Sequence, residues 1–266
     1  MSTAREINIE ELKRLMLCIM QDIDKFCREH NIRYCLAYGS LLGAIRHKGY
    51  IPWDDDIDIW MPRPDYMRFM KEYRHPCYSA YCAEFTPGWD HFIAKVCDDR
   101  TIIDEGLGDT CGVYVDVFPL DGWPDKKSHL HAHYRRVMFY LRMWSSLHYT
   151  AKFDIKKGNG IAKNMKILAS KGLRLFYSSE KALNRMLKEK MKYPYESSSH
   201  IGSLTCGDWA IPRNHIEPLI EGEFEGNRFL IPANYDEWLT AIFGDYMQLP
   251  PEEQRVSNHG FKAYWK

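Results

Sequence analysis

The stretch from Tyr38 to Trp60, YGSLLGAIRHKGYIPWDDDIDIW, decides the fold that we expect for the rest of the chain. Its first half places Gly39-Ser40 ahead of a short helical run, and its second half carries the acidic segment 54–59. This stretch therefore predicts, in close succession, the end of a strand, a Gly-Ser turn, a helix and a second, acidic strand.

The acidic segment changes from consecutive aspartates to an alternation of aspartate and isoleucine. Side chains of a strand point to its two faces in turn. If this segment is extended, Ile57 and Ile59 point into a core and one face carries the carboxylates of Asp54, Asp56 and Asp58. Carboxylates on one face repel each other unless a cation lies between them, and Mg²⁺ prefers such oxygen ligands. The pattern predicts a magnesium site.

Two other interpretations of the acidic segment are weaker. A solvated acidic loop has no need of isoleucines in alternation. A calcium-binding EF-hand loop requires glycine at its sixth position, which Ile59 occupies.

The Gly39-Ser40 pair lies where residues 32–38 predict a strand and residues 41–45 predict a helix. Glycine at such a turn lets the backbone approach a phosphate, and the N-terminus of the helix supplies N–H donors. No Gly-Lys-Ser or Gly-Lys-Thr follows, so the turn is not a P-loop.

A further acidic position occurs in the strand expected over residues 111–120. Its valines share one face, and Tyr114, Asp116 and Phe118 share the other. An aspartate in so apolar a strand is costly unless it is paired or bound to a metal ion. We expect Asp116 to be the third carboxylate of the site, and a structural salt bridge is the alternative.

These motifs resemble a known family. Gly39-Ser40 followed by Asp56-x-Asp58 resembles the nucleotidyltransferase superfamily, and the longer string GSLLGAIRHKGYIPWDDDIDI resembles the LicD family within it. LicD proteins are similar to phosphocholine transferases of bacterial surface glycans and to fukutin-related enzymes. The resemblance continues in DVFPLDG from Asp116 and in FGDYMQLPPEEQR near the C-terminus, and it leaves the middle of the chain uncovered.

The resemblance implies an α/β (α+β) fold, a small mixed sheet of nucleotidyltransferase type with flanking helices and a helical insertion. It implies three residues that are both catalytic and metal-binding: Asp56, Asp58 and Asp116. They would hold one or two Mg²⁺ ions, with Mn²⁺ as the alternative cation. Asp116 would also accept the proton of the acceptor hydroxyl.

The resemblance also implies a set of substrate-binding residues. Ser40 would hold the phosphates of the donor. Arg46, His47 and Lys95 would add positive charge at the transferred group. Tail residues are usually exposed, but the resemblance places this tail against the site. A strand lysine is most often a solvated edge residue, which is the alternative for Lys95. The substrate-binding residues are Gly39, Ser40, Arg46, His47, Trp53, Lys95, Arg255 and His259.

The implied reaction is the Mg²⁺-dependent transfer of a phospho-alcohol, above all phosphocholine, from a CDP-activated donor such as CDP-choline. The acceptor would be a hydroxyl of a glycan or lipid-linked glycan of lipopolysaccharide, teichoic acid or capsule, and CMP would leave. Two rival functions remain open. One is a nucleotidyltransferase that transfers NMP and releases pyrophosphate, and the other is a non-catalytic glycan- or lipid-binding protein of the same fold.

Length and charge suggest a single domain over residues 1–266 with a basic helical insertion at 126–192. The whole chain has a formal net charge of zero, whereas this segment holds 17 Lys and Arg against 3 acidic residues, a net charge of +14. Such asymmetry points to an anionic partner. The apolar stripe over residues 161–176 predicts contact with an anionic membrane. A helix packed on the core with solvated lysines is the alternative.

The remaining features favour a cytoplasmic protein at the inner face of the plasma membrane, with no nucleic-acid partner. No run of eighteen apolar residues occurs, and the N-terminal MSTAREINIEEL lacks the apolar segment of a signal peptide. The eight cysteines include no Cys-x-x-Cys pair and are expected to be reduced. His129 and His133 are expected on a solvated helix face.

Overall fold

A computed structural model describes residues 5–89, 91–104, 111–149, 172–173, 176–203, 210–256 and 262–266. The chain divides into two compact units. The first comprises Met1–Leu120 and Ile211–Lys266, and the second comprises Asp121–Ala210. The insertion expected at 126–192 lies inside the second unit.

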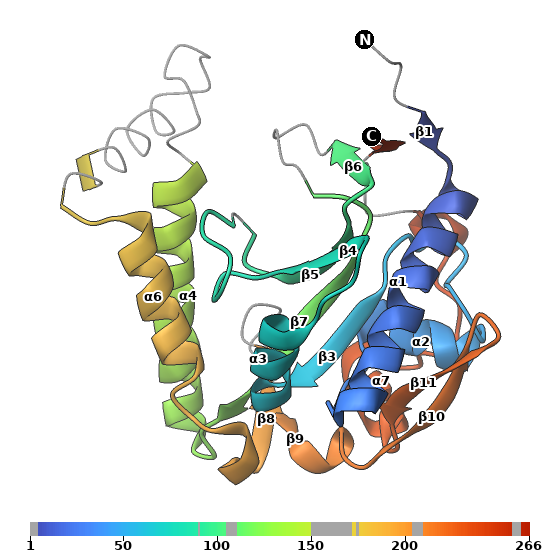
Figure 1. Cartoon of the computed structure of the whole chain (residues 1–266). Helices are drawn as coiled ribbons and strands as arrows, with labels where there is room; N and C mark the ends of the chain where they lie inside the picture. Colours follow the sequence, from blue (N-terminus) through green and yellow to red (C-terminus); the bar gives the residue numbers. More distant parts are fainter. Residues whose placement is uncertain are drawn as a thin grey trace. The chain divides into compact units, whose positions relative to one another are not determined.

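The first unit contains the main mixed sheet, whose strand order is β2-β3-β7-β5-β4 (Figure 1). Strands β3 and β7 are parallel, and the other neighbours on this path are antiparallel. Flanking helices complete the α/β architecture, which confirms the predicted fold class. The elements up to the second unit are β1 (Glu6–Ile7), α1 (Ile9–His30), β2 (Cys35–Leu36), α2 (Tyr38–Arg46), β3 (Asp58–Pro62), α3 (Arg63–Glu72), β4 (Tyr78–Tyr81), β5 (Ala94–Asp98), β6 (Thr101–Asp104) and β7 (Tyr114–Trp123).

The chain returns to the first unit after residue 210. A hairpin of β10 and β11 and the helix α7 make up most of this return. The returning elements are β9 (Ile211–Pro212), η2 (Arg213–His215), β10 (Leu219–Phe224), β11 (Asn227–Pro232), α7 (Tyr235–Phe243), η3 (Glu252–Gln254) and β12 (Lys262–Trp265).

Helix α1 has a capping residue at each end and one buried face. The side chain of Asn8 accepts a hydrogen bond from the backbone N–H of Glu11, which caps the first turn. Asn31 adopts the left-handed conformation that ends the helix. Its buried stripe consists of Leu12, Met16, Ile19, Met20, Ile23 and Cys27. Phe26 makes edge contacts with Phe69 and Tyr73, which join α1 to α3.

Aromatic packing covers part of the face of the sheet that carries Asp58. Trp60 follows Asp58 by two residues and so points to the same face. The ring of Tyr38 lies 4.9 Å from that of Trp60 and 5.8 Å from that of Trp238, which belongs to α7. The first residue of α2 and helix α7 therefore pack together on the acidic face.

The acidic strand and the C-terminal end of the chain show what the local sequence pattern did not predict. The acidic strand begins only at Asp58, so residues 54–57 precede it, although Ile57 and Ile59 are buried as expected. Residues 262–265, to which no element was assigned from the sequence, form β12 between β1 and β6. That three-stranded sheet pairs segments far apart in sequence, which a local pattern does not reveal.

The second unit is built around α4 (Lys127–Tyr149) and α6 (Ser179–Lys190), with η1 (Tyr195–Ser197) and β8 (His200–Gly202). Its core includes Trp123, Trp144 and Met186. His133 is fully buried, so the expected solvated face is wrong for this residue. The apolar stripe predicted over 161–176 lies outside the described residues except at its end. Within the described part of the chain, no helix combines the length and apolar character needed to span a membrane.

Candidate active site

The centre of the site is a row of charged side chains across three adjacent strands. Asp58 on β3 lies directly opposite Asp116 on β7, and Asp116 lies opposite Lys95 on β5. Residues opposite each other point to the same face, and neighbouring strands are about 4.8 Å apart. All three residues are buried. The sheet therefore brings two of the predicted carboxylates and the predicted lysine together.

Lys95 is an interior residue of the sheet and not a solvated edge residue. Its Nζ lies 2.7 Å from Oδ1 of Asp116 and 3.2 Å from the ring centre of Tyr114. Burial alone would lower the pKa of Lys95, but the negative charge of Asp116 and the influence of Tyr114 outweigh it and raise the pKa. Lys95 is therefore a permanent cation beside the acidic residues. Asp116 therefore forms a salt bridge with Lys95, which was the alternative prediction for this residue. It also lies opposite Asp58, as expected of a residue in the site.

Asp58 is the carboxylate whose ionisation is most strongly opposed. Burial raises its pKa well above the usual value, and the charges of Asp56, Asp116 and Asp54 raise it further, while Lys95 acts in the opposite direction. A cation placed among these groups would relieve both the repulsion and the cost of burial. Buried carboxylates that need a nearby cation to ionise are typical of a metal-binding site.

The donor chemistry of this cluster fits Mg²⁺ or Mn²⁺, because every candidate ligand is a carboxylate oxygen. Among the residues that the structure describes, however, no three His, Cys, Asp or Glu side chains converge as a ready-made metal centre. The residues that would hold the ion are the predicted Asp56, Asp58 and Asp116, and their side chains would have to draw together around it.

Gly39 and Ser40 were expected in a turn ahead of the helix, but they lie in the first turn of α2, against the acidic segment. A Cβ atom on Gly39 would lie 2.5 Å from Oδ2 of Asp54, so a larger residue here would require this carboxylate to shift. The hydroxyl oxygen of Ser40 accepts a hydrogen bond of 2.9 Å from the backbone N–H of Asp58. Both residues thus position the acidic segment, a role that the phosphate-binding prediction did not include. The strained backbone is at Tyr38, whose φ is +42°, and not at Gly39.

A second group of predicted substrate-binding residues forms a basic and aromatic cluster in the same unit. The guanidinium of Arg255 lies 5.7 Å from the ring centre of Trp53, and His47 approaches that ring edge-on at 6.3 Å. Arg46 donates to Nε2 of His47 at 2.9 Å and to the carbonyl of Tyr246 at 2.7 Å. Burial, then the charge of Arg46, lowers the pKa of His47. The tail up to Arg255 therefore lies against this cluster.

Some positions lie beyond what the sequence predicted or what the structure describes. His259 lies outside the described residues, and no geometry tests it. The sequence placed Tyr114 on the same strand face as Asp116, but no role was predicted for it. The alternation of the strand could have indicated that Tyr114 lies beside the site. Asp54 was expected on the metal-binding face of a strand, and its contact with Gly39 was not foreseen.

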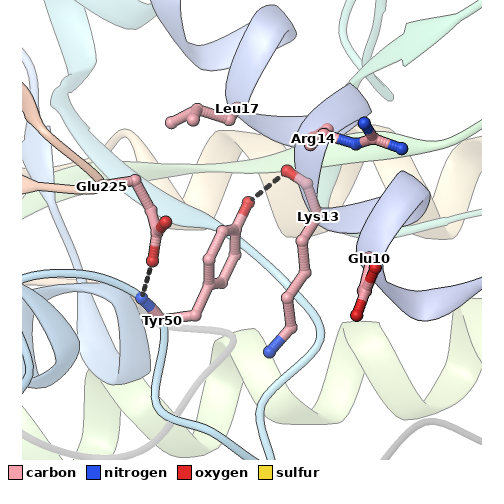
Figure 2. Close-up of a pocket in the computed structure, with 6 residues that line it drawn as sticks. All are labelled: Glu10, Lys13, Arg14, Leu17, Tyr50 and Glu225. Atoms are coloured by element: carbon pink, nitrogen blue, oxygen red, sulfur yellow. Dashed lines mark hydrogen bonds between the residues drawn. The ribbon is translucent and has the colours of Figure 1, made fainter.

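A pocket of about 280 Å³ lies beside Tyr50, in the segment that leads to the acidic residues (Figure 2). The residues that line it hold this segment in place. The hydroxyl of Tyr50 donates to the carbonyl of Lys13 at 2.8 Å, and the backbone N–H of Tyr50 donates to Glu225 at 3.0 Å. The side chain of Lys13 extends beside the Tyr50 ring, 4.9 Å from its centre. Helix α1 and the β10–β11 turn thereby fix the chain just before Trp53 and Asp54.

Comparison with known proteins agrees with this geometry. A family model described as the LicD/FKTN/FKRP nucleotidyltransferase domain matches residues 31–157, which include β3, β5 and β7. An uncharacterised protein of Rickettsia typhi is 40% identical over 68 residues, 25% of this chain and 22% of that protein. An uncharacterised protein of Rickettsia prowazekii is 45% identical over 47 residues, 18% of each chain.

A further relative aligns with nearly the whole chain. The lipopolysaccharide cholinephosphotransferase LicD of Haemophilus influenzae is 32% identical over 269 residues, which cover 98% of this chain and 99% of that protein. The match therefore extends across both units and through the acidic row. On the strength of this alignment and of the matching domain, the chain belongs to the LicD family.

Proposed function

We propose that this protein is a phosphotransferase that moves phosphocholine from CDP-choline to a hydroxyl group of a lipopolysaccharide-type glycan and releases CMP. The observation that carries the proposal is the buried row of Asp58, Asp116 and Lys95 in a chain related end to end to a lipopolysaccharide cholinephosphotransferase. A lysine and carboxylates on one face suit a reaction in which charge develops on phosphoryl oxygens.

The residues of the chain have distinct proposed roles. Asp56, Asp58 and Asp116 would hold Mg²⁺, which would neutralise the charge of the donor's phosphoryl oxygens. Asp116 accepts the proton of the acceptor hydroxyl as that oxygen attacks the phosphorus atom. Lys95 holds the Asp116 carboxylate in position for this step, because its ammonium group lies 2.7 Å from Oδ1 of Asp116.

The basic and aromatic cluster receives the donor in this proposal. Arg46 and Arg255 supply positive charge toward the diphosphate, and the ring of Trp53 offers an aromatic face to the choline ammonium. The backbone N–H groups at the start of α2 add donors for the phosphates. The nearness of Trp53 to Asp54 in sequence places the two clusters next to each other along the chain.

Product analysis by ³¹P NMR tests the proposal against its rivals. The protein is incubated with Mg²⁺, an oligosaccharide released from lipopolysaccharide by mild acid and, in two parallel reactions, CDP-choline or CTP. We expect CMP and a new phosphodiester signal. Release of pyrophosphate from CTP, with the nucleotide retained on the oligosaccharide, would instead establish a nucleotidyltransferase. Binding of the oligosaccharide without consumption of either nucleotide would establish a binding protein.

The reaction is proposed to take place at the anionic inner face of the plasma membrane. The support is the basic segment 126–192, of which the described parts include α4 and α6. Outward-facing side chains on these helices include Arg135, Arg142, Lys181 and Lys188, and Phe139 on α4 is 60% exposed. Basic side chains around an exposed aromatic residue are typical of a surface that rests on anionic lipid.

A further inference from the structure

A cavity of about 440 Å³ lies along the outer edge of the main sheet, away from the residues assigned above. Strand β4 ends the strand order, and among the described residues it pairs only with β5. Its backbone and the end of α3 line the cavity together with ring side chains. These ring residues are Tyr73, His75, Tyr78, Tyr81 and Phe85. A concave site of this size lined by rings and a few polar groups is typical of ligand binding.

The loop that closes one side of this cavity is held in place from within. Glu84 accepts a hydrogen bond from Arg63 at 2.7 Å and another from the hydroxyl of Tyr66 at 2.9 Å, and all three side chains are largely or wholly buried. Thr86 and Cys82 exchange two further hydrogen bonds. The neighbouring Phe85 is nevertheless 45% exposed. A rigid loop that holds a large ring in solvent presents a preformed contact surface.

The chemistry of the cavity favours a sugar chain that carries negative charge. The face of a sugar ring presents C–H groups that pack on aromatic rings, and its rim presents hydroxyl groups. Among the described residues the outer edge of β4 pairs with no other strand, so its backbone groups can hydrogen-bond those hydroxyls. Lys71 and Arg74, both exposed, border the cavity and complement an acidic substituent such as phosphate.

We propose that this cavity is a binding site for an anionic saccharide, a distal part of the glycan acceptor. The inference rests on the proposed function for its choice of saccharide, and the register of the sheet supports it. Tyr81 lies opposite Lys95, so the row that begins at Asp58 and Asp116 continues to the rim of this cavity. Three strand spacings, about 14 Å, separate β3 from β4. A glycan of several sugars can therefore contact both places.

Saccharide binding is measured by titration calorimetry without donor or metal, so the result does not depend on catalysis. The probe is the phosphorylated oligosaccharide released from lipopolysaccharide by mild acid. Phe85→Ala should weaken its affinity roughly tenfold, the effect of losing one well-packed aromatic contact. Arg74→Gln should weaken binding of the phosphorylated probe more than binding of the same probe after dephosphorylation.

Two matched variants serve as controls. Phe243→Ala removes a ring of similar exposure, 42%, from α7, and Arg68→Gln removes a partly exposed arginine from α3, the helix that ends just before Arg74. Neither residue lines the cavity, and both variants should bind the probe like the unmodified protein. Equal affinity in Phe85→Ala and Phe243→Ala would overturn the inference, as would no binding of the probe. The proposed transfer reaction could still hold in either case, because it is scored by CMP release.

Discussion

The Lys95–Asp116 pair is the residue-scale feature with the clearest energetic consequence. Two buried opposite charges 2.7 Å apart stabilise each other, and removal of one partner leaves the other uncompensated. Asp116→Asn and Lys95→Met should each lower the free energy of unfolding of the metal-free protein by about 3–5 kcal/mol. Denaturant unfolding in EDTA measures this, and the double variant should lose clearly less than the sum of the two single losses.

Additive losses in that double-mutant cycle would show that the two side chains do not interact energetically. A stable Asp116→Asn variant in EDTA would also contradict the buried pair. It would favour the simpler picture drawn from the sequence, in which Asp116 is only one of several repelling carboxylates around a metal site.

Gly39 offers a second test at the scale of single residues. A methyl group there would meet Oδ2 of Asp54 at 2.5 Å, so Gly39→Ala should displace the acidic segment and lower turnover at least tenfold, with only a modest fall in melting temperature. Gly172→Ala is the control, since its added methyl group meets nothing within 4 Å. Normal turnover in Gly39→Ala would show that the contact with Asp54 is not needed.

At the scale of elements, burial of His133 predicts that the second unit loses stability in acid. Burial, followed by the charge of Arg136, lowers the pKa of His133 to about 4, and neither ring nitrogen has a hydrogen-bond partner among the described residues. Other charged groups that influence it are Glu189, Asp121 and Lys192. The unfolded chain binds a proton near its ordinary pKa of about 6.5. The contribution of neutral His133 to the free energy of unfolding should therefore be fully present above about pH 6.5 and should be lost as the pH decreases toward 4.

Thermal melts at pH 7 and pH 5 test this prediction by comparing the protein with His133→Gln, which does not titrate. The melting temperature should fall more between pH 7 and pH 5 for the unmodified protein than for the variant. An identical pH dependence of the two proteins would show that His133 is not buried in the neutral form.

The segment before the acidic residues is predicted to depend on its two anchors, α1 and the β10–β11 turn. Tyr50→Phe removes the hydrogen bond to the carbonyl of Lys13 and should cost about 1 kcal/mol. Glu225→Ala removes the acceptor of the Tyr50 amide proton. Hydrogen exchange of that amide should accelerate in Glu225→Ala and not in Arg228→Ala, a substitution elsewhere in the same hairpin. Unchanged exchange in both would mean that other contacts hold the segment.

The sequence predicts elements well where one local pattern suffices and poorly where distant segments meet. The alternation around Asp116 appears within a single window, and a strand contains this residue as expected. The pairing of Lys95 with Asp116 depends on β5 lying beside β7, which no local pattern specifies. The burial of His133 likewise depends on packing against Trp123 and Tyr193, and the pairing of β12 joins the two ends of the chain.

At the scale of the whole molecule, the uneven charge leads to a prediction about membranes. The protein should sediment with vesicles containing phosphatidylglycerol and not with pure phosphatidylcholine vesicles. Added salt should release it, because exposed charges are screened over about 8–10 Å. Phe139→Ala and the pair Arg135→Gln, Arg142→Gln should weaken sedimentation, whereas Phe243→Ala should not. Equal sedimentation with both vesicle types would remove the electrostatic basis of the proposal.

The central claim is that the buried acidic row is the metal-dependent site of phosphocholine transfer. The most direct test is CMP release from CDP-choline by Asp58→Asn in Mg²⁺, with melting in EDTA as the check on folding. Because burial and neighbouring carboxylates oppose the ionisation of Asp58, the metal-free variant should be at least as stable as the unmodified protein. Its turnover should fall by orders of magnitude. Near-normal turnover by the folded variant, or turnover by the unmodified protein in EDTA, would contradict the account.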